Sequence, residues 1–454
     1  SDGLPAYRSL PAAVALPETV EQVQAVLRAC SQLGVPVVAR GAGTGLSGGA
    51  LPYPGCVLLS LAKFNRILEI DPEARIARVQ PGVRNLAISE AAAPLGLFYA
   101  PDPSSQIACS IGGNVAENAG GVHCLKYGLT VHNILKLQVV TIEGEILTLG
   151  SAALDAAGFD LMALMTGSEG LLGVVTEVMV KLTPLPDTAR VILACFDDVE
   201  IAAGAVAAII SAGVIPAGLE MMDGPALRAA EDFAHAGYPK DAAAILLCEL
   251  DGQDHDVAEE IARVSALLRA AGAVEVRLAR DEAERTRFWA GRKGAFAAMG
   301  RIAPDYYCID GTIPRRSLPK VLTEMSRLAD AHGLGVANVF HAGDGNLHPL
   351  ILYDASQEGD LERAEALGGA ILELCVSVGG SITGEHGVGR EKINQMCVQF
   401  SQAEIEAFHA LKRAFDPRGL LNPGKAIPTL ARCAEFGRMH VHHGELPFAH
   451  LERF

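Results

Sequence analysis

The stretch Arg40-Gly41-Ala42-Gly43-Thr44-Gly45-Leu46-Ser47-Gly48-Gly49 decides the fold of the N-terminal half of the chain. A helical pattern at 18–33 and an apolar run at 35–40, which is typical of a buried strand, precede it. The glycines fit the Rossmann spacing G-x-G-x-x-G, but a Rossmann site needs a helix directly afterwards. Prolines and a second strand-like run at 56–61 follow instead. This order predicts a loop whose backbone amides bind a pyrophosphate directly, because glycine permits close approach.

Two further glycine-rich segments lie in the same half. One begins with Pro-Asp-Pro-Ser-Ser at 101–105 and continues through Ser-Ile-Gly-Gly-Asn-Val-Ala-Glu-Asn-Ala-Gly-Gly at 110–121, and the other covers 166–177. Each segment alone is also consistent with a tight turn. Three such loops between strand-like runs favour a site for an extended dinucleotide such as FAD.

Composition narrows the classes of function. The chain has 454 residues and a net charge of −16, so we expect two or three domains and no binding to nucleic acid or to anionic membranes. No two cysteines have C-x-x-C spacing, which argues against a thiolate zinc site or an iron–sulfur cluster within this chain. The start of the chain does not resemble a signal peptide, and the ten cysteines are expected to be reduced and buried in a cytoplasmic protein.

Residues 201–219 carry no charge, which is also typical of a membrane span. Gly213 and Pro216 interrupt the run, and Asp197 and Asp198 precede it as candidate caps. A helix that ends near Gly213 and is followed by a strand is therefore expected, with no direct membrane span.

The C-terminal third contains the strongest candidate for a metal site. Phe-His-Ala-Gly-Asp-Gly-Asn-Leu-His at 340–348 offers His341 and His348, and Gly-Glu-His-Gly at 384–387 offers Glu385 and His386. A strand and turn that bring both imidazoles to one ion, with Glu385 as third ligand, would leave open positions as catalytic sites do. His386 would then act as a base. Such a ligand set suits Zn, Mn or Fe(II), and the alternative is that the histidines only form hydrogen bonds in a polar turn.

A carboxylate substrate would also be bound well by a guanidinium group. Arg292 lies beside the only tryptophan of the chain and is the preferred candidate, while Arg315, Arg316 and Lys392 are weaker ones. Four histidines near the C-terminus suggest either a second metal site or a tail that faces a partner: His440, His442, His443 and His450.

Strand-like runs at 191–196 and 243–250 alternate with helical patterns after about residue 185. They predict an α+β cap domain with an antiparallel sheet. A last helix is expected at about 402–415, before Pro417.

The glycine-rich segments at 40–50, 101–121 and 165–177 resemble the flavin-binding loops of the vanillyl-alcohol-oxidase-like (PCMH-type) FAD domain. The resemblance continues through the histidine segments to Leu-Asn-Pro-Gly-Lys at 421–425 and covers nearly the whole chain. It places the chain near the FAD-linked D-lactate and D-2-hydroxyglutarate dehydrogenases. The segment at 433–444 is similar to the FAD-binding subunits of bacterial glycolate oxidases in particular.

This resemblance implies an α+β architecture with three parts. A PCMH-type FAD-binding domain would occupy 1–186, and a substrate or cap domain with the antiparallel sheet and the metal site would occupy 187–400. The C-terminal helix and tail at 401–454 would return to the FAD domain. His123 and Cys124 follow the second loop, but the near family does not tether its flavin, so non-covalent FAD is expected.

The resemblance also implies roles for individual residues. His341, His348 and Glu385 match the metal ligands of the family, His386 matches its base, and Arg292 matches an arginine that binds the substrate carboxylate. The positions that match the FAD-binding residues of the family are Arg40, Gly41, Ala42, Gly43, Thr44, Gly45, Leu46, Pro101, Asp102, Ser105, Gly112, Gly113, Asn114, Asn118, Gly120, Gly121, Glu169, Gly170, Gly173, Val174, Val175 and Asn422.

The activity implied is FAD- and metal-dependent oxidation of a small D-2-hydroxy acid, with glycolate and glyoxylate as the preferred pair. Electrons would pass to companion glycolate oxidase subunits, one of them an iron–sulfur subunit, or to quinone, at the inner membrane. D-lactate and D-2-hydroxyglutarate are alternative substrates. A metal-dependent hydrolase and a flavoprotein subunit that only docks partners are alternatives from other classes.

Overall fold

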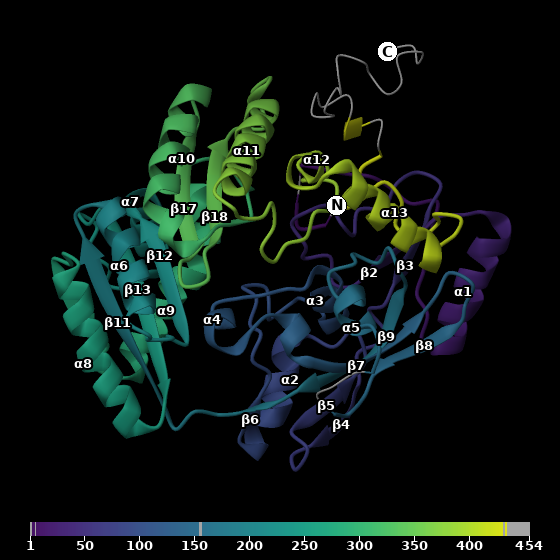
Figure 1. The fold of residues 1–454 in the computed structure, drawn as a ribbon, viewed down its shortest axis with the longest axis horizontal. Helices are drawn as coiled ribbons and strands as arrows, with labels where there is room; N and C mark the ends of the chain where they lie inside the picture. Colours follow the sequence, from purple (N-terminus) through teal and green to yellow (C-terminus); the bar gives the residue numbers. More distant parts are fainter. Residues whose placement is uncertain (1, 5, 154–156, 430–431, 434–454) are drawn as a thin grey trace.

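The computed structural model describes residues 2–4, 6–153, 157–429 and 432–433. The four histidines of the tail and most of the segment at 433–444 lie outside the described residues. Figure 1 shows the N-terminal half in purple and blue, the following sheet with its helices in teal and green, and the last helices in yellow beside the N-terminal half.

The N-terminal half contains two larger sheets and one strand pair. A parallel sheet has the order β1-β3-β2 and an antiparallel sheet has the order β4-β5-β9-β7-β8. The strands are β1 (Ala13–Ala15), β2 (Val37–Arg40), β3 (Val57–Ser60), β4 (Ile67–Asp71), β5 (Ile76–Val79), β7 (Ile134–Val140), β8 (Ile146–Gly150) and β9 (Val174–Lys181), with β6 (Leu97–Phe98) paired to β10 (Thr183–Pro184). The helices of this half are α1 (Val20–Leu33), α2 (Asn85–Ala92), α3 (Ile111–Glu117), α4 (Cys124–Tyr127) and α5 (Leu161–Met165).

The connection from β2 to β3 decides between a Rossmann site and a loop whose backbone amides bind a pyrophosphate directly. Residues 41–56 are all described and form turns and bends, with no helix among them. A Rossmann site is therefore excluded, as the sequence predicts, because the helix that would follow the glycines is absent.

The second half is built around one antiparallel sheet with the order β14-β11-β13-β12-β17-β18-β15, and β16 also pairs with β18. Its strands are β11 (Thr188–Phe196), β12 (Gly218–Asp223), β13 (Ala244–Gly252), β14 (Glu275–Leu278), β15 (Asp305–Cys308), β16 (Gly311–Thr312), β17 (Gly335–His341) and β18 (Asn346–Tyr353). Its helices are α6 (Val199–Ser211), α7 (Gly224–Ala234), α8 (Asp254–Ala270), α9 (Glu282–Ala298), α10 (Leu318–His332) and α11 (Asp360–Ser377). The expected α+β cap with an antiparallel sheet is thus present.

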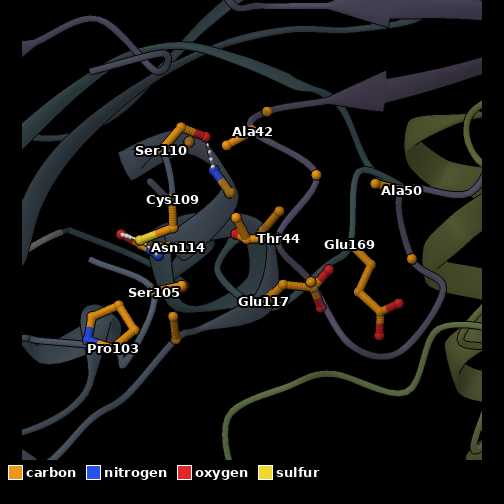
Figure 2. Close-up of a pocket in the computed structure, with 18 of the residues that line it drawn as sticks. Ala42, Thr44, Ala50, Pro103, Ser105, Cys109, Ser110, Asn114, Glu117 and Glu169 are labelled. Atoms are coloured by element: carbon orange, nitrogen blue, oxygen red, sulfur yellow. Dashed lines mark hydrogen bonds between the residues drawn. The ribbon is translucent and has the colours of Figure 1, made fainter. Parts of the chain in front are cut away.

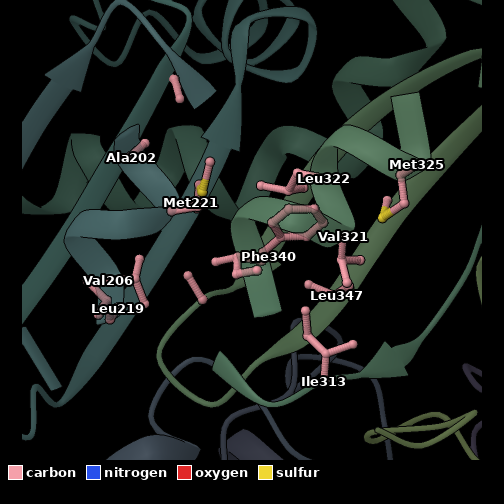
Figure 3. Packing of buried hydrophobic residues seen from close by; sticks show 14 of the residues in the cluster. Ala202, Val206, Leu219, Met221, Ile313, Val321, Leu322, Met325, Phe340 and Leu347 are labelled. Atoms are coloured by element: carbon pink, nitrogen blue, oxygen red, sulfur yellow. The ribbon is translucent and has the colours of Figure 1, made fainter. Parts of the chain in front are cut away.

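Helices cover both faces of this sheet. The helices α6, α8, α10 and α11 pack on one face, and α7 and α9 pack on the other. Figure 3 shows the first core, where Phe340 and Leu347 of the sheet lie against Val321, Leu322 and Met325 of α10. Because side chains alternate along a strand, burial of Phe340 and Leu347 in this core directs their neighbours His341 and His348 to the opposite face.

The uncharged run at 201–219 forms all but the first two residues of α6, a turn and the start of β12. The Asp198 carboxylate caps α6 by accepting hydrogen bonds from the amides of Glu200 and Ile201. Across the described residues, no helix combines the length and the apolar character needed to cross a bilayer.

The chain then returns to its N-terminal half through α12 (Met396–Gln399) and α13 (Gln402–Phe415). The Val37 amide donates to the Leu420 carbonyl at 2.8 Å, and the Asn422 amide donates to the Val37 carbonyl at 2.8 Å. Residues 420–422 therefore extend the β2 edge. The expected boundary at 186 falls between β10 and β11, and the one at 400 falls between α12 and α13; both remain predictions.

One prediction about the cysteines is wrong. Cys397 and Cys433 form a disulfide with a Cα–Cα distance of 5.3 Å, whereas all ten cysteines were expected to be reduced. The pairing depends on how α12 and the segment after α13 meet in space, which sequence spacing does not report. The other eight cysteines are buried and free, as expected.

Candidate active site

One pocket is lined by the glycine-rich loops, part of which Figure 2 shows, and by the histidine segments. Sixteen of the predicted FAD-binding residues line it: Arg40, Gly41, Ala42, Gly43, Thr44, Gly45, Leu46, Ser105, Gly112, Gly113, Asn114, Glu169, Gly170, Gly173, Val174 and Val175. At its other end the pocket is lined by His341, His348, Glu385, His386 and Phe296. Three loops of one half and a cluster from the other half therefore share one cavity.

Close packing of the loops explains their glycines. A Cβ on Gly41 would lie 2.2 Å from the Ser110 hydroxyl oxygen, so a side chain there would force the first two loops apart. Ser110 caps α3, and its hydroxyl accepts a hydrogen bond from the Gly113 amide at 3.4 Å. The first loop therefore lies directly against the start of the second.

The predicted metal ligands come together. The Glu385 Oε1 atom lies 3.3 Å from His341 Nε2 and 3.1 Å from His348 Nε2. The three groups are buried, with ligand atoms within 4.8 Å of one another. The Nε2 atom of His348 is buried and, although Glu385 Oε1 is close, forms no well-aligned hydrogen bond with any described residue. Two imidazole nitrogens facing one carboxylate oxygen fit a divalent cation.

Strand register explains how His341 is oriented. Glu220 on β12 lies directly opposite His341 on β17, and its two carboxylate oxygens lie 2.8 and 3.0 Å from His341 Nδ1. The Nδ1 proton of the ring thus points to Glu220, which leaves Nε2 for the Glu385 side. Burial alone would lower the pKa of His341, but the Glu220 and Glu385 carboxylates outweigh it and raise that pKa well above its usual value.

Asp310 holds the loop that carries Glu385 and His386. Its carboxylate accepts hydrogen bonds from the amides of residues 384, 385 and 386 and from the Thr383 hydroxyl. The Lys392 ammonium lies 2.8 Å away and is fully buried with it. Lys392 and the histidines His386 and His348 outweigh the burial of Asp310 and hold the pKa of its carboxyl well below its usual range.

His386 is a neutral imidazole at the edge of this cluster. Burial lowers the pKa of His386 to about 4, and the Asp310 carboxylate only partly offsets that effect. The ring nitrogen Nδ1 is buried and has no hydrogen-bond partner among the described residues. His386 can therefore accept a proton from a ligand bound beside Glu385.

Comparison with known proteins assigns the chain to a family. Residues 11–150 match the FAD binding domain model, and residues 185–426, more than half of the chain, match the model of the C-terminal domain of FAD linked oxidases.

The chain belongs to the FAD-linked oxidases.

Individual relatives agree with this assignment. The chain is 70% identical over 453 residues to the glycolate oxidase subunit GlcD of Escherichia coli K12, covering 100% of this chain and 91% of that protein. It is 41% identical to the GlcD subunit of Bacillus subtilis, covering 95% and 92%. A structure of p-cresol methylhydroxylase with substrate bound matches with a TM-score of 0.79 and 19% identity, over 95% of this chain and 91% of that one. The last match confirms the PCMH-type fold.

Six predicted FAD-binding residues of this FAD-linked oxidase do not line the pocket: Pro101, Asp102, Asn118, Gly120, Gly121 and Asn422. Asn422 supports the pocket wall, and Pro101 has a partner outside the lining. The Asn422 side chain donates to the carbonyls of Gly49 and Glu169, and the Pro101 carbonyl accepts from the Asn85 side chain. Direct contact of these six with FAD remains a prediction.

Asp102 and Asn118 have partners of their own. The Asp102 carboxylate lies 2.8 Å from His123 Nδ1 and accepts from the His123 amide at 3.1 Å. The Asn118 side-chain oxygen accepts a hydrogen bond from the Val131 amide at 3.0 Å. His123 Nε2 lies 3.2 Å from Glu249, so both ring nitrogens face carboxylates.

Arg292 lies behind His341 rather than along the pocket. Its side chain is 1% exposed, and its Nη2 atom lies 2.6 Å from Glu220 Oε2. Arg292 therefore shares with His341, a predicted metal ligand, the Glu220 carboxylate. Its assignment to the substrate carboxylate remains a prediction.

Sequence reasoning missed four residues with clear positions in the site. Glu220 and Asp310 orient the ligands, while Glu117 and Phe296 line the pocket; the ring centroids of Phe296 and His348 are 6.2 Å apart. Glu220 is the single acid in the apolar strand-like run at 218–222, and Asp310 directly follows the apolar run at 306–309. An acid next to so many apolar residues could have identified both positions from the sequence, because a buried acid needs a charged or hydrogen-bonding partner.

Proposed function

We propose that this chain oxidises a small D-2-hydroxy acid to the 2-oxo acid, with glycolate as its principal substrate and glyoxylate as the product. The pocket that joins the three glycine-rich loops to His341, His348, Glu385 and His386 carries this proposal. The 70% identity to a glycolate oxidase subunit supports glycolate over D-lactate or D-2-hydroxyglutarate.

The residues of the pocket fit both the FAD and the divalent metal that such a reaction needs. Small residues form most of the loop wall, which allows a dinucleotide to approach the backbone. His341, His348 and Glu385 would hold a divalent metal, Zn, Mn or Fe(II), with His341 oriented by Glu220. A bound metal would polarise the substrate hydroxyl, and bound FAD would supply the acceptor for the hydride from the substrate Cα.

The side chains of this chain perform the remaining steps. His386 takes the hydroxyl proton, because its pKa of about 4 keeps the ring neutral before the reaction. Asp310 keeps that ring in place by binding the amide of the same residue at 3.0 Å. The Phe296 side chain adds apolar surface beside His348, which restricts entry of water and of bulky substrates.

The experiment that tests this proposal is anaerobic reduction. The FAD- and metal-loaded chain is mixed with glycolate, D-lactate or D-2-hydroxyglutarate, and the flavin absorbance is followed. We expect glycolate to bleach the flavin fastest, and His386→Gln to slow the bleaching by about 10²–10⁴-fold, the usual contribution of a general base. His255→Gln is the matched control, because the His255 side chain is 82% exposed on α8.

Three results would count against the proposal. Failure of all three acids to bleach the flavin would overturn it. Hydrolysis of esters or amides without flavin would favour a metal-dependent hydrolase. Unchanged turnover in His386→Gln would favour a subunit that only docks partners.

We further propose that electrons leave through companion subunits, one of which carries iron–sulfur clusters, and pass on to quinone. The relatives are named as subunits, which supports an assembly. The chain would then act in the cytoplasm and be held at the inner membrane by those subunits. Co-purification of the tagged chain with an iron-containing protein that reoxidises its flavin tests this, and full quinone reduction by the isolated chain would contradict it.

A further inference from the structure

Glu117 is a pocket residue to which the steps above assign no role. It is the last residue of α3 and lines the cavity between the first loop and the histidine cluster. Figure 2 shows its carboxyl group next to that of Glu169, with Glu117 on the side of Thr44. Two acids therefore share one wall of a cavity that otherwise consists mainly of small side chains.

The two carboxyl groups differ in their partners. Glu169 accepts hydrogen bonds from the amides of Val388 at 2.7 Å and Gly389 at 2.8 Å. The Glu117 Oε2 atom is buried and has no hydrogen-bond partner among the described residues. Glu169 thus has a structural role in holding the loop after His386, whereas Glu117 has polar capacity left for a ligand.

Two glycines show where the Glu117 carboxyl lies. A Cβ on Gly387 would lie 2.0 Å from Glu117 Oε2, and one on Gly49 would lie 2.8 Å from Oε1. The carboxyl is therefore wedged between the first loop and the backbone that follows His386. In the proposed reaction the flavin ring would lie along this wall, in the pocket that Glu117 and His386 share.

The surrounding charges favour the protonated form of this acid. Burial and the neighbouring Glu169 raise the pKa of Glu117 well above its usual value, with Asp2 acting in the same direction. Lys392 and Lys425 oppose the shift without cancelling it. A neutral carboxylic acid keeps an O–H donor, which an ionised carboxylate lacks.

We propose that Glu117 donates a hydrogen bond to the isoalloxazine ring of bound FAD and thereby stabilises the reduced ring. Two-electron reduction adds electron density to the nitrogens and carbonyl oxygens of the ring, so a fixed donor binds the reduced form more strongly than the oxidised form. The inference rests on the proposed function for the position of the ring. It assigns to this chain a residue that sets the reduction potential of its cofactor.

The reduction potential of the holoenzyme tests the inference. Midpoint potentials of wild type, Glu117→Gln and Glu117→Ala are measured with a chemical reductant and reference dyes, without any hydroxy acid. We expect Glu117→Ala to disfavour reduction about tenfold, which is about 30 mV for a two-electron couple. Glu117→Gln keeps an N–H donor and is expected to stay close to wild type. Glu145→Ala, an exposed acid of the same half outside the pocket, is the control.

Infrared spectroscopy gives a second readout that needs only the near-isosteric variant. The reduced-minus-oxidised difference spectrum of wild type is expected to contain a protonated carboxylic acid C=O band that is missing in Glu117→Gln. Equal potentials in wild type and Glu117→Ala, or absence of that band, would overturn the inference. Because neither measurement uses a substrate, bleaching by glycolate tests the proposed function separately.

Discussion

At the scale of single residues, Glu220 contacts two residues of the candidate site from its position in a strand. It faces His341 across β12 and β17 and also pairs with Arg292. Burial raises the pKa of Glu220, but His341 and Arg292 outweigh it and the net pKa is lowered, so the group remains a carboxylate. One buried anion thus orients His341, a predicted metal ligand, and neutralises an arginine.

Glu220→Gln should weaken metal binding about 10- to 100-fold, as loss of such an outer carboxylate does elsewhere. The amide keeps the size of the side chain but removes the charge that orients the His341 ring. Metal affinity is measured by competition with a chelator, and FAD content should stay unchanged. Glu324→Gln, at a partly exposed ion pair on α10, is the control. Equal metal affinity in Glu220→Gln and wild type would contradict the role of Glu220.

Asp310 and Lys392 form a second buried pair, with both side chains fully buried. Asp310→Asn or Lys392→Met alone should lower the free energy of unfolding by about 3–5 kcal/mol, because each leaves a buried charge without its partner. The free energy of unfolding of the double variant should fall by less than the sum of the decreases in the two single variants. Urea unfolding measures this, and strict additivity would show that the pair is not coupled.

The residues that could be predicted from the sequence are those with a local signal. His341, His348 and Glu385 stand in short glycine-containing segments whose residue types already indicate a metal. The orienting residues could not be found in that way. Glu220 meets His341 only through the β12–β17 register, and Asp310 meets the amides of 384–386 from 74 positions away or more.

At the scale of elements, the apolar periodicity within one segment was sufficient to predict a helix or a strand there. Helices such as α1 and α13 and strands such as β2 and β13 follow from apolar spacing and end signals within about twenty residues. The Cys397–Cys433 disulfide could not be predicted, because it depends on the return of the chain after α13. The packing of α12 against that segment is a tertiary contact with no local pattern.

Cys397→Ser should lower the free energy of unfolding by up to about 4 kcal/mol, which is the loop-closure value for a 36-residue separation. Reductant should have the same effect on wild type and none on the variant, because the other eight cysteines are free. Urea unfolding with and without dithiothreitol measures this. A reductant effect that persists in the variant would contradict the assignment.

At the scale of the whole molecule, His123 connects the two halves of the chain. It faces Asp102 in the N-terminal half and Glu249 on β13, and Arg285 and Trp289 also bind Glu249. Burial would lower the pKa of His123, but the two carboxylates raise it to about 10. His123 and Arg285 outweigh the burial of Glu249 and lower the pKa of Glu249 to about 2.

These shifts give the contact between the halves a defined pH dependence. The folded-state pKa of His123 lies above its usual 6.5, so its stabilisation is complete below pH 6.5 and is lost as the pH rises to about 10. The stability difference between wild type and His123→Gln should therefore shrink over that range by up to about 5 kcal/mol, about 1.4 kcal/mol for each unit by which the pKa is raised. Urea unfolding at several pH values measures it, and a constant difference would contradict the assignment.

The pairing of residues 420–422 with β2 also has a consequence for biosynthesis. Asn422 and Lys425 bind the carbonyl of Gly49, more than 370 positions earlier in the chain. The wall around the first glycine-rich loop is thus incomplete until residue 425 has left the ribosome. FAD should therefore bind only after this segment has been translated. A nascent chain stalled before residue 420 would have an incomplete FAD-binding site.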